Sequence, residues 1–381
     1  MQIPFRLAAA GRGTVEVGLI AAIGVATAVF MSTALVLPGL ISAFDIGPGA
    51  AGFVSGVQLA GFVVTSFLAG RVTTPSPRLF VLAMLVLAGA NLTTAVIDEF
   101  AALLVLRFIA GLALGVITWL SWAGVFGDPR RMGEIAVVGP IAGVVASPLV
   151  GLLVEAGSFR WVYLALGVVS FVPLLWIPSF EGAVRSEDRV RSGRGAPAAY
   201  VLIVALAMLS IGGSAVFVFG GVIAESRLAI SPGAYSLVLA GNAAAGIPAA
   251  RWKGDRPLTG MWLISCGLCA VIFATTSIAV VGAAAIIFWG FAFWVGIPGT
   301  YALLSRVSRF PAERAGDAQG AMAVGRILGP ILGGSLIALG SEITLGIVAG
   351  SLMAAGGAAI VMTELRNHRA ELGPGVPPEP G

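Results

Sequence analysis

The sequence predicts an all-α membrane protein with twelve transmembrane helices in two pseudo-symmetric six-helix bundles. The chain has 381 residues, of which 58% are hydrophobic and only 10% charged, whereas soluble domains carry about 25% charged residues. Apolar runs of about 20 residues recur along the whole chain, and this is the length that a helix needs to cross a bilayer. No segment alternates apolar and polar residues over about ten positions, as the strands of a membrane barrel would.

Each apolar run is expected to be a helix, because lipid offers no partner for backbone polar groups outside a helix or closed barrel. The first run is too long for a cleavable signal peptide and is followed by eleven more, so we expect it to remain in the protein. The expected spans are residues 17–43, 49–69, 79–97, 100–125, 133–154, 161–178, 199–223, 233–250, 257–277, 280–303, 318–340 and 343–363.

A charged stretch after the sixth run divides the spans into two sets of six. We therefore expect one bundle at residues 1–179, a cytoplasmic linker at 180–197 and a second bundle at 198–365. The last residues, 366–381, are rich in Pro, Gly and Glu. This composition predicts a disordered cytoplasmic tail.

The basic residues predict the orientation, because Lys and Arg concentrate in cytoplasmic loops. With the N-terminus in the cytoplasm, most of the 22 basic residues fall inside, whereas Arg160 and Arg227 fall outside and Arg107 and Arg326 fall within spans. Both termini are then cytoplasmic, and the pI of about 9.6 reflects orientation rather than binding to nucleic acid. We expect a monomer in the lipid bilayer of a bacterial inner membrane.

Spans five and eleven share a pattern of small residues and proline that indicates an internal repeat. A second short match, PGA, opens spans two and eight at 48–50 and 232–234. Glycines four residues apart share one helix face and allow close packing in lipid, and proline bends a helix. We expect these two helices to act in gating at the boundary between the bundles; ordinary tight crossings are the alternative. The matching residues are Gly143 with Gly325, Pro148 with Pro330 and Gly151 with Gly333, and Gly329 completes the second set.

These features resemble the major facilitator superfamily of twelve-helix secondary transporters over about residues 15–365. The arginine and glycine-spaced run of that family's fourth helix has a counterpart in LRFIAGLALG at 106–115. In proton-coupled exporters of that family the fifth helix carries a G-x-x-x-G-P-x-x-G-G pattern. Span five here has Ser147 and Leu152 in place of two of its glycines, and the complete pattern stands instead in span eleven. The acid usual between helices two and three is missing from residues 69–78. The resemblance implies alternating access to a site between the halves.

Arg107 and Arg326 are charges deep within apolar spans. Each lies nine residues after an acid, Asp98 or Asp317, and so about 13 Å deep at 1.5 Å per residue. Burying such a charge costs at least about 2.5–3.5 kcal/mol, so each side chain needs a partner or a wet cavity. We expect both to line the substrate or proton pathway. The alternative is that either one snorkels to the membrane surface or bonds to backbone carbonyl groups as a helix clamp.

No Asp or Glu lies near mid-depth, so if protons are coupled, Asp45, Glu134 or Asp317 at the span ends would carry them. The alternative is that these acids are solvated charges at the ends of their spans.

Uncharged candidates for the same pathway are Gln58, Asn91 and Asn242, which are amides within spans two, three and eight. Span ten contains FWGFAFW, in which Trp289 and Trp294 lie below the level of an ordinary interfacial tryptophan belt. The two rings are expected to point about 140° apart, so at most one faces the pathway.

No cofactor or metal is expected. CGLC at 266–269 lies in an apolar helix without His or an acid nearby, and a zinc site needs about four ligands. No glycine loop followed by lysine is present to bind the phosphates of ATP. No convergent catalytic set is visible, so we do not expect an enzyme.

The predicted function is therefore secondary transport of a small organic solute by alternating access. Proton-coupled efflux of an amphipathic compound is the first hypothesis, with protons as the coupling ion. Transport of a small organic or inorganic anion through Arg107 and Arg326 is the second. A transport-inactive membrane sensor or assembly partner with the same fold is the alternative from another class.

Overall fold

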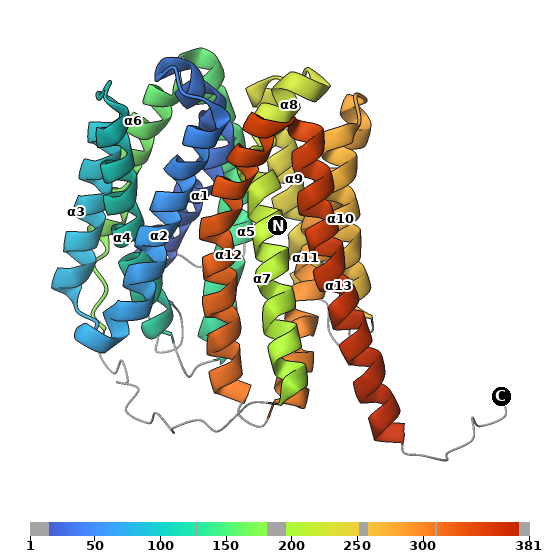
Figure 1. Cartoon of the computed structure of the whole chain (residues 1–381). Coiled ribbons are helices and arrows are strands. Elements are labelled where there is room, and N and C mark those ends of the chain that lie inside the picture. The colour runs from blue at the N-terminus through green and yellow to red at the C-terminus, as the bar shows by residue number, and fades with distance from the viewer. Residues whose placement is uncertain (1–14, 126–128, 181–195, 251–257, 309–310, 373–381) are drawn as a thin grey trace, which may run out of the picture.

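The computed structural model describes the whole chain except residues 1–14, 126–128, 181–195, 251–257, 309–310 and 373–381, and its described elements are all helical (Figure 1). In chain order these elements are α1 (Val17–Ala43), α2 (Pro48–Val72), α3 (Pro77–Thr94), α4 (Phe100–Ala123), α5 (Pro129–Ala156), α6 (Phe159–Val169), the 3-10 turn η1 (Val172–Leu175), α7 (Pro197–Val218), α8 (Gly220–Leu228), α9 (Pro232–Ala250), α10 (Thr259–Thr275), α11 (Ala279–Val307), α12 (Pro311–Leu339) and α13 (Glu342–Leu372).

Several helices begin where the sequence carries an N-terminal signal. Proline opens α2, α3 and α7, and it is tolerated there because the first N–H of a helix has no partner within the helix. Ser76 caps α3 by accepting a hydrogen bond from the Leu79 N–H at 3.3 Å. Ser158 caps α6 in the same way, accepting from the Arg160 N–H at 3.2 Å.

The helical membrane class is confirmed, whereas the number of spans is only partly supported. Nine helices in the described part of the chain are long and apolar enough to cross a membrane. Two shorter apolar helical stretches, Phe159–Leu175 and Thr259–Thr275, add to them. The count of twelve therefore remains a prediction.

The structure differs from the expected spans in two places. The seventh expected span is divided, because α7 ends at Val218 and α8 starts at Gly220 after Phe219. Both sides of this break are apolar, so the composition of the segment does not reveal it. At the other end of the chain, α13 continues to Leu372, so residues 366–372 of the expected disordered tail are helical. The rest of that tail and most of the expected linker lie outside the described residues.

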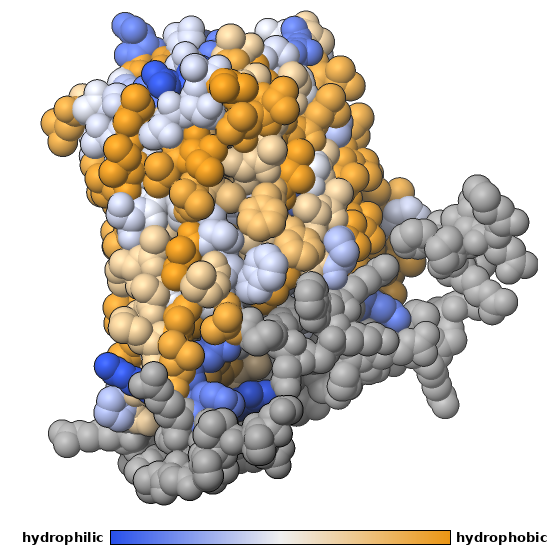
Figure 2. Space-filling view, turned by 90° about the vertical axis from the view of Figure 1, so that its right-hand side faces the viewer, coloured by the Kyte–Doolittle hydropathy of each residue, from blue (hydrophilic) through white to orange (hydrophobic). Residues whose placement is uncertain are grey.

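The outer surface of the helices is apolar. Leu82, Leu152 and Leu268 each expose more than half of their surface. In the face that Figure 2 shows, hydrophobic residues dominate the middle of the molecule and hydrophilic ones gather towards its ends. An apolar surface of this extent requires lipid contact.

The helices form two groups, with α1 to α6 packing mainly on one another and α7 to α13 doing the same (Figure 1). Between the groups, α2 packs on α12, α5 on α9 and α1 on α8. Glycines make these approaches close: Gly52 lies against the backbone of Pro330, Gly151 against Ser236, and Gly221 against the backbone of α1. These contacts lie near the end of the molecule where α8 is found, which we call the closed end.

Candidate functional site

Arg107 is completely buried in α4 and is held by two other helices of the first group. Its guanidinium donates hydrogen bonds to Asn91 Oδ1 at 3.1 Å, to the Ala90 carbonyl oxygen at 3.2 Å and to Thr94 Oγ1 at 2.6 Å. These three acceptors all belong to α3. On the other side, the guanidinium carbon lies 4.4 Å from the centre of the Tyr163 ring on α6, a cation–π contact.

These contacts match the helix-clamp alternative for Arg107. Its charge is compensated by neutral acceptors and a ring, and no described carboxylate pairs with it. Its partners on α3 and α6 lie within the first group of helices and do not extend towards α12. The prediction that Arg107 lines the substrate or proton pathway therefore receives no support from its surroundings.

Glycines on the same helix bring α4 close to α2. Gly111 lies against the carbonyl oxygen of Gln58, and Gly115 lies against Thr65 and the Phe62 carbonyl oxygen. A Cβ atom at either glycine would collide with these atoms. Gln58 is consequently part of the packed contact between α2 and α4, and only 5% of its surface is exposed.

Arg326 has a different environment, since its side chain is exposed although it lies in the middle of α12. Val324 and Leu328 are also exposed, at 51% and 47%, and these apolar side chains mark the lipid-facing side. At about 100° per residue, Arg326 points about 160° away from both of them. The exposed guanidinium thus lies on the side of α12 that faces away from lipid.

The neighbours of Arg326 on that side are polar or aromatic. Gln319, two turns earlier on α12, is exposed on nearly the same face. Tyr301 of α11 is near enough to interact electrostatically with the guanidinium, and its hydroxyl donates to the sulfur of Met322 at 3.5 Å. Within the described part of the chain, no hydrogen bond or ion pair holds Arg326. Such a charge is available to a solute.

The three candidate proton carriers lie at helix ends. Asp45 is exposed in the turn after α1, in a left-handed conformation with φ of 48°. Glu134 accepts a hydrogen bond from the Val15 N–H at 3.2 Å. Asp317 pairs with Arg314 at 2.6 Å near the start of α12. The last two carboxylates therefore already serve as acceptors for groups of the protein.

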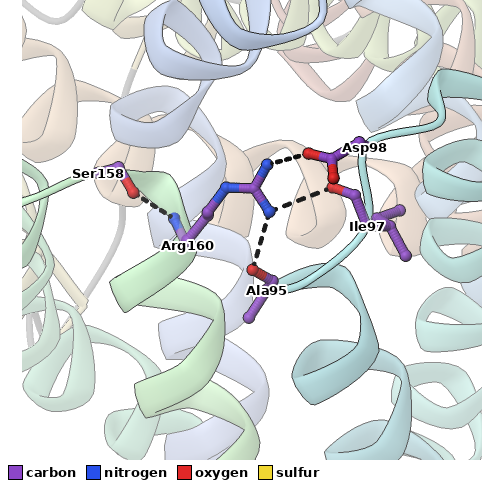
Figure 3. A network of polar contacts seen from close by, with 5 residues as sticks. All are labelled: Ala95, Ile97, Asp98, Ser158 and Arg160. Atoms are coloured by element: carbon purple, nitrogen blue, oxygen red, sulfur yellow. Dashed lines mark hydrogen bonds and ion pairs between the residues drawn. The ribbon is translucent and has the colours of Figure 1, made fainter.

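Arg160 forms a polar network at the closed end that the sequence did not reveal (Figure 3). Its guanidinium pairs with Asp98 and donates to the carbonyl oxygens of Ala95 at 3.1 Å and Ile97 at 3.3 Å. These contacts fasten the start of α6 to the loop between α3 and α4. Asp98 is 86% exposed, so water weakens the ion pair.

The other predicted pathway residues pack between helices of the second group. The Asn242 side-chain N–H donates to the Ile286 carbonyl oxygen at 2.6 Å and ties α9 to α11. Trp289 is only 7% exposed. Trp294 lies beside Gly246 of α9. The contacts of these three residues do not include Arg326, so their assignment to the pathway remains a prediction.

The two small-residue helices contact different neighbours. On α5, Gly143 faces Ala243 and Gly151 faces Ser236, and both partners belong to α9 in the other group. Pro148 lies between these two contacts, and Pro140 also lies inside α5; a proline within a helix removes a backbone hydrogen bond and favours a bend. The small residues of α12 instead pack on α7 within their own group; they are Gly325, Gly329 and Gly333. Across the groups, α12 approaches α2 through Pro330 and Gly334.

The described residues offer no metal site, since no group of three or more His, Cys, Asp or Glu side chains converges among them. Cys266 and Cys269 are both buried free thiols. Cys266 lies against the Trp289 carbonyl oxygen at 3.9 Å. These two cysteines are part of the packing of α10 on its neighbours.

The family model of the Major Facilitator Superfamily matches residues 19–334. The chain belongs to this family. The superfamily consists of transporters, so the protein is a secondary transporter rather than an enzyme, and the resemblance inferred from the sequence is confirmed.

Solved structures of other Major Facilitator Superfamily transporters share the fold. A peptide transporter in complex with sulfate has 12% identity and a TM-score of 0.75, with 93% of this chain and 96% of that one covered. The nucleoside transporter NupG has 15% identity and a TM-score of 0.68, with 93% and 99% covered. The human organic anion transporter MFSD10 has 14% identity and a TM-score of 0.66, with 91% and 98% covered. At these identities the likeness establishes the fold alone.

The sequence did not predict which residues surround Arg107 and Arg326. Tyr163 and Thr94 hold Arg107 from other helices, and only the relative rotation of the helices brings them there. Gln319 had a detectable signal, since it lies seven positions before Arg326 and so shares its face. Helical periodicity therefore places Gln319 on the face of Arg326, whereas it does not predict which residues of other helices hold Arg107.

Proposed function

We propose that this protein moves a small organic anion across the membrane by alternating access, with Arg326 as the residue that attracts the anion. The proposal includes twelve spans in two six-helix bundles, with the solute site between them. The exposure of Arg326 on the side of α12 that faces away from lipid is the observation that supports it.

The charge distribution favours an anion over a cation. Arg326 is held by no carboxylate in the described residues, and the three candidate acids lie at helix ends. A deep guanidinium without a counter-charge is costly unless water or an anion compensates it. A carboxylate or phosphate fits the planar donors of arginine best, because it can accept two parallel hydrogen bonds.

The test is uptake of radiolabelled organic acids, sugars and hydrophobic cations by vesicles that contain the purified protein. We expect flux of at least one organic acid, and we expect Arg326→Gln to reduce it at least tenfold, because a charged hydrogen bond contributes about 1.5–3 kcal/mol. Arg366→Gln removes an exposed arginine of α13 and should leave flux unchanged. Full flux of the anion by Arg326→Gln would exclude this role.

Proton-coupled efflux of an amphipathic compound is the second candidate. The complete glycine and proline pattern of α12 supports it, since these residues pack tightly on α7 beside the contact with α2. Export of a dye from cells should then stop when the proton gradient is dissipated. Export that continues without the gradient would exclude proton coupling, and absence of flux for every solute would favour the sensor alternative.

The proposed setting is the inner membrane of a bacterium, with both termini in the cytoplasm and the protein as a monomer. The basic residues at the ends of the helices opposite the closed end support this orientation, since Arg78, Arg306, Arg314 and Arg366 all lie there. Protease treatment of sealed, right-side-out vesicles should therefore leave a C-terminal tag intact.

A further inference from the structure

A groove runs along the outer face of α3, away from Arg326 and from the contacts between the two helix groups. Its volume is about 430 Å³, within the range of about 300–1,000 Å³ typical of small-molecule sites. The residues that line it are Pro77, Arg78, Val81, Leu82, Leu85 and Ile177.

The floor of this α3 groove is formed by residues that lie along one face of α3. Arg78, Val81, Leu82 and Leu85 follow one another at spacings of three, one and three, so they share one face of α3 over about 10 Å. Leu82 and Leu85 are 57% and 45% exposed, so the helix packing leaves them uncovered.

The segment that follows η1 forms the side wall of the groove. Ile177 of this segment is 51% exposed and lines the groove. The ring of Phe180 lies 6.4 Å from that of Phe80 on α3, which keeps the segment beside the helix. The groove is thus a mainly apolar channel between α3 and this segment.

Arg78 provides a positive charge at one end of this channel. Its side chain is exposed, and no hydrogen bond or ion pair links it to another residue in the described ranges. The candidate span Pro77–Thr94 begins beside it, so the guanidinium lies at the level of lipid headgroups. Trp176, which is 48% exposed in the adjacent segment, is of the type that occupies this level.

We propose that the α3 groove binds an anionic phospholipid. The phosphate would bind Arg78, because a guanidinium offers paired donors to phosphate oxygens, and an acyl chain would lie along Val81, Leu82 and Leu85. A zwitterionic phospholipid fills the same apolar channel but adds no net charge to complement Arg78. The preference for anionic lipid therefore depends on the arginine, and the general affinity for lipid depends on the channel.

Native mass spectrometry of the purified full-length protein in detergent tests this proposal, with phosphatidylglycerol and phosphatidylcholine added separately. The wild type should retain phosphatidylglycerol about fivefold more strongly, since an arginine near a membrane surface contributes about 1 kcal/mol. Arg78→Gln should abolish this preference. Leu82→Trp, which fills the channel but keeps the charge, should weaken retention of both lipids. Arg366→Gln, an exposed arginine without a groove, should behave as the wild type.

Three results would each overturn the proposal. The first is equal retention of the two lipids by the wild type, which would mean occupation by any lipid or detergent. The second is an unchanged preference for phosphatidylglycerol in Arg78→Gln, or unchanged retention of both lipids in Leu82→Trp. The third is a loss in Arg366→Gln as large as that in Arg78→Gln, because it would indicate a general charge effect. Transport is not measured, so these outcomes are independent of the proposed function.

Discussion

The two membrane-embedded arginines have opposite environments. Arg107 is completely buried and donates three hydrogen bonds to α3, whereas Arg326 is exposed and held by no described residue. A buried guanidinium with this many partners fixes the positions of the helices that supply them. We propose that the exposed Arg326, on the inner side of α12, attracts a solute. Similar depth in the sequence thus corresponds to different environments.

Replacing Arg107 should mainly lower the thermal stability of the folded protein. Arg107→Gln leaves the acceptors on Asn91 and Thr94 without their donor, and a buried unsatisfied polar group costs about 1–3 kcal/mol. We expect a lower melting temperature of the purified protein in detergent. Arg160→Gln is the matched control, because its ion pair is exposed and should contribute less than about 1 kcal/mol.

An unchanged melting temperature with lost transport would contradict the clamp role of Arg107. It would instead support the original prediction that this arginine lines the substrate or proton pathway. Equal destabilisation by Arg107→Gln and Arg160→Gln would show that burial is not what distinguishes the two.

At the level of elements, α12 packs on helices of both groups and also carries Arg326. Its glycines pack on α7, while the carbonyl oxygen of Pro330 approaches Gly52 of α2 in the other group. Small residues let backbones come this close in lipid, where van der Waals contact rather than water exclusion drives association. The same helix presents Arg326 between these two contacts.

Replacing glycine by alanine, which adds one methyl group, should affect the stability of the protein differently at packed and unpacked positions of α12. A Cβ at Gly329 would collide with the Ile211 carbonyl oxygen, whereas no atom lies within 4 Å of a Cβ at Gly320. Gly329→Ala should therefore destabilise the protein by about 1–3 kcal/mol. Gly320→Ala should be neutral or stabilising by up to about 1 kcal/mol, because alanine favours helix. Thermal melts that rank the two variants in the reverse order would contradict this packing.

The element boundaries show what could be predicted from the sequence. The first expected span, 17–43, coincides with α1, because charged or turn residues bound its apolar run. The break at Phe219 was missed because apolar residues continue through it. The partners of Arg107 could not be predicted for another reason: helix rotation and tertiary packing bring Tyr163 to it, and neither follows from spacing within one helix. The inner face of Arg326, in contrast, follows from helical periodicity once the exposure of Val324 and Leu328 shows which side of α12 faces lipid.

For the whole molecule, the arrangement of contacts predicts which movement transport requires. The two groups of helices meet at the closed end, where α2 packs on α12 and α5 on α9. Alternating access requires these contacts to separate so that the site between the groups can open at that end. The short helix α8, which packs on α1, would have to move with them.

A disulfide across the closed end should arrest transport. A Cβ at Gly49 lies 3.9 Å from the Cβ of Ala338, and disulfides join Cβ atoms about 3.5–4.5 Å apart. We expect Gly49→Cys with Ala338→Cys to form a bond under mild oxidation and to lose flux. Reduction should restore the flux, and either single variant should transport normally. Undiminished flux in the fully oxidised double variant would contradict rocking of the two groups at this contact.

The central claim is that Arg326 lies in a water-accessible interior between the two groups of helices. The most direct test is labelling of single cysteines by a charged, membrane-impermeant thiol reagent, after Cys266 and Cys269 are replaced by alanine. The account predicts rapid labelling of Arg326→Cys and no labelling of Val324→Cys or Leu328→Cys, which occupy the lipid-facing side of the same helix. An unreactive Arg326→Cys, or equal labelling at all three positions, would contradict it.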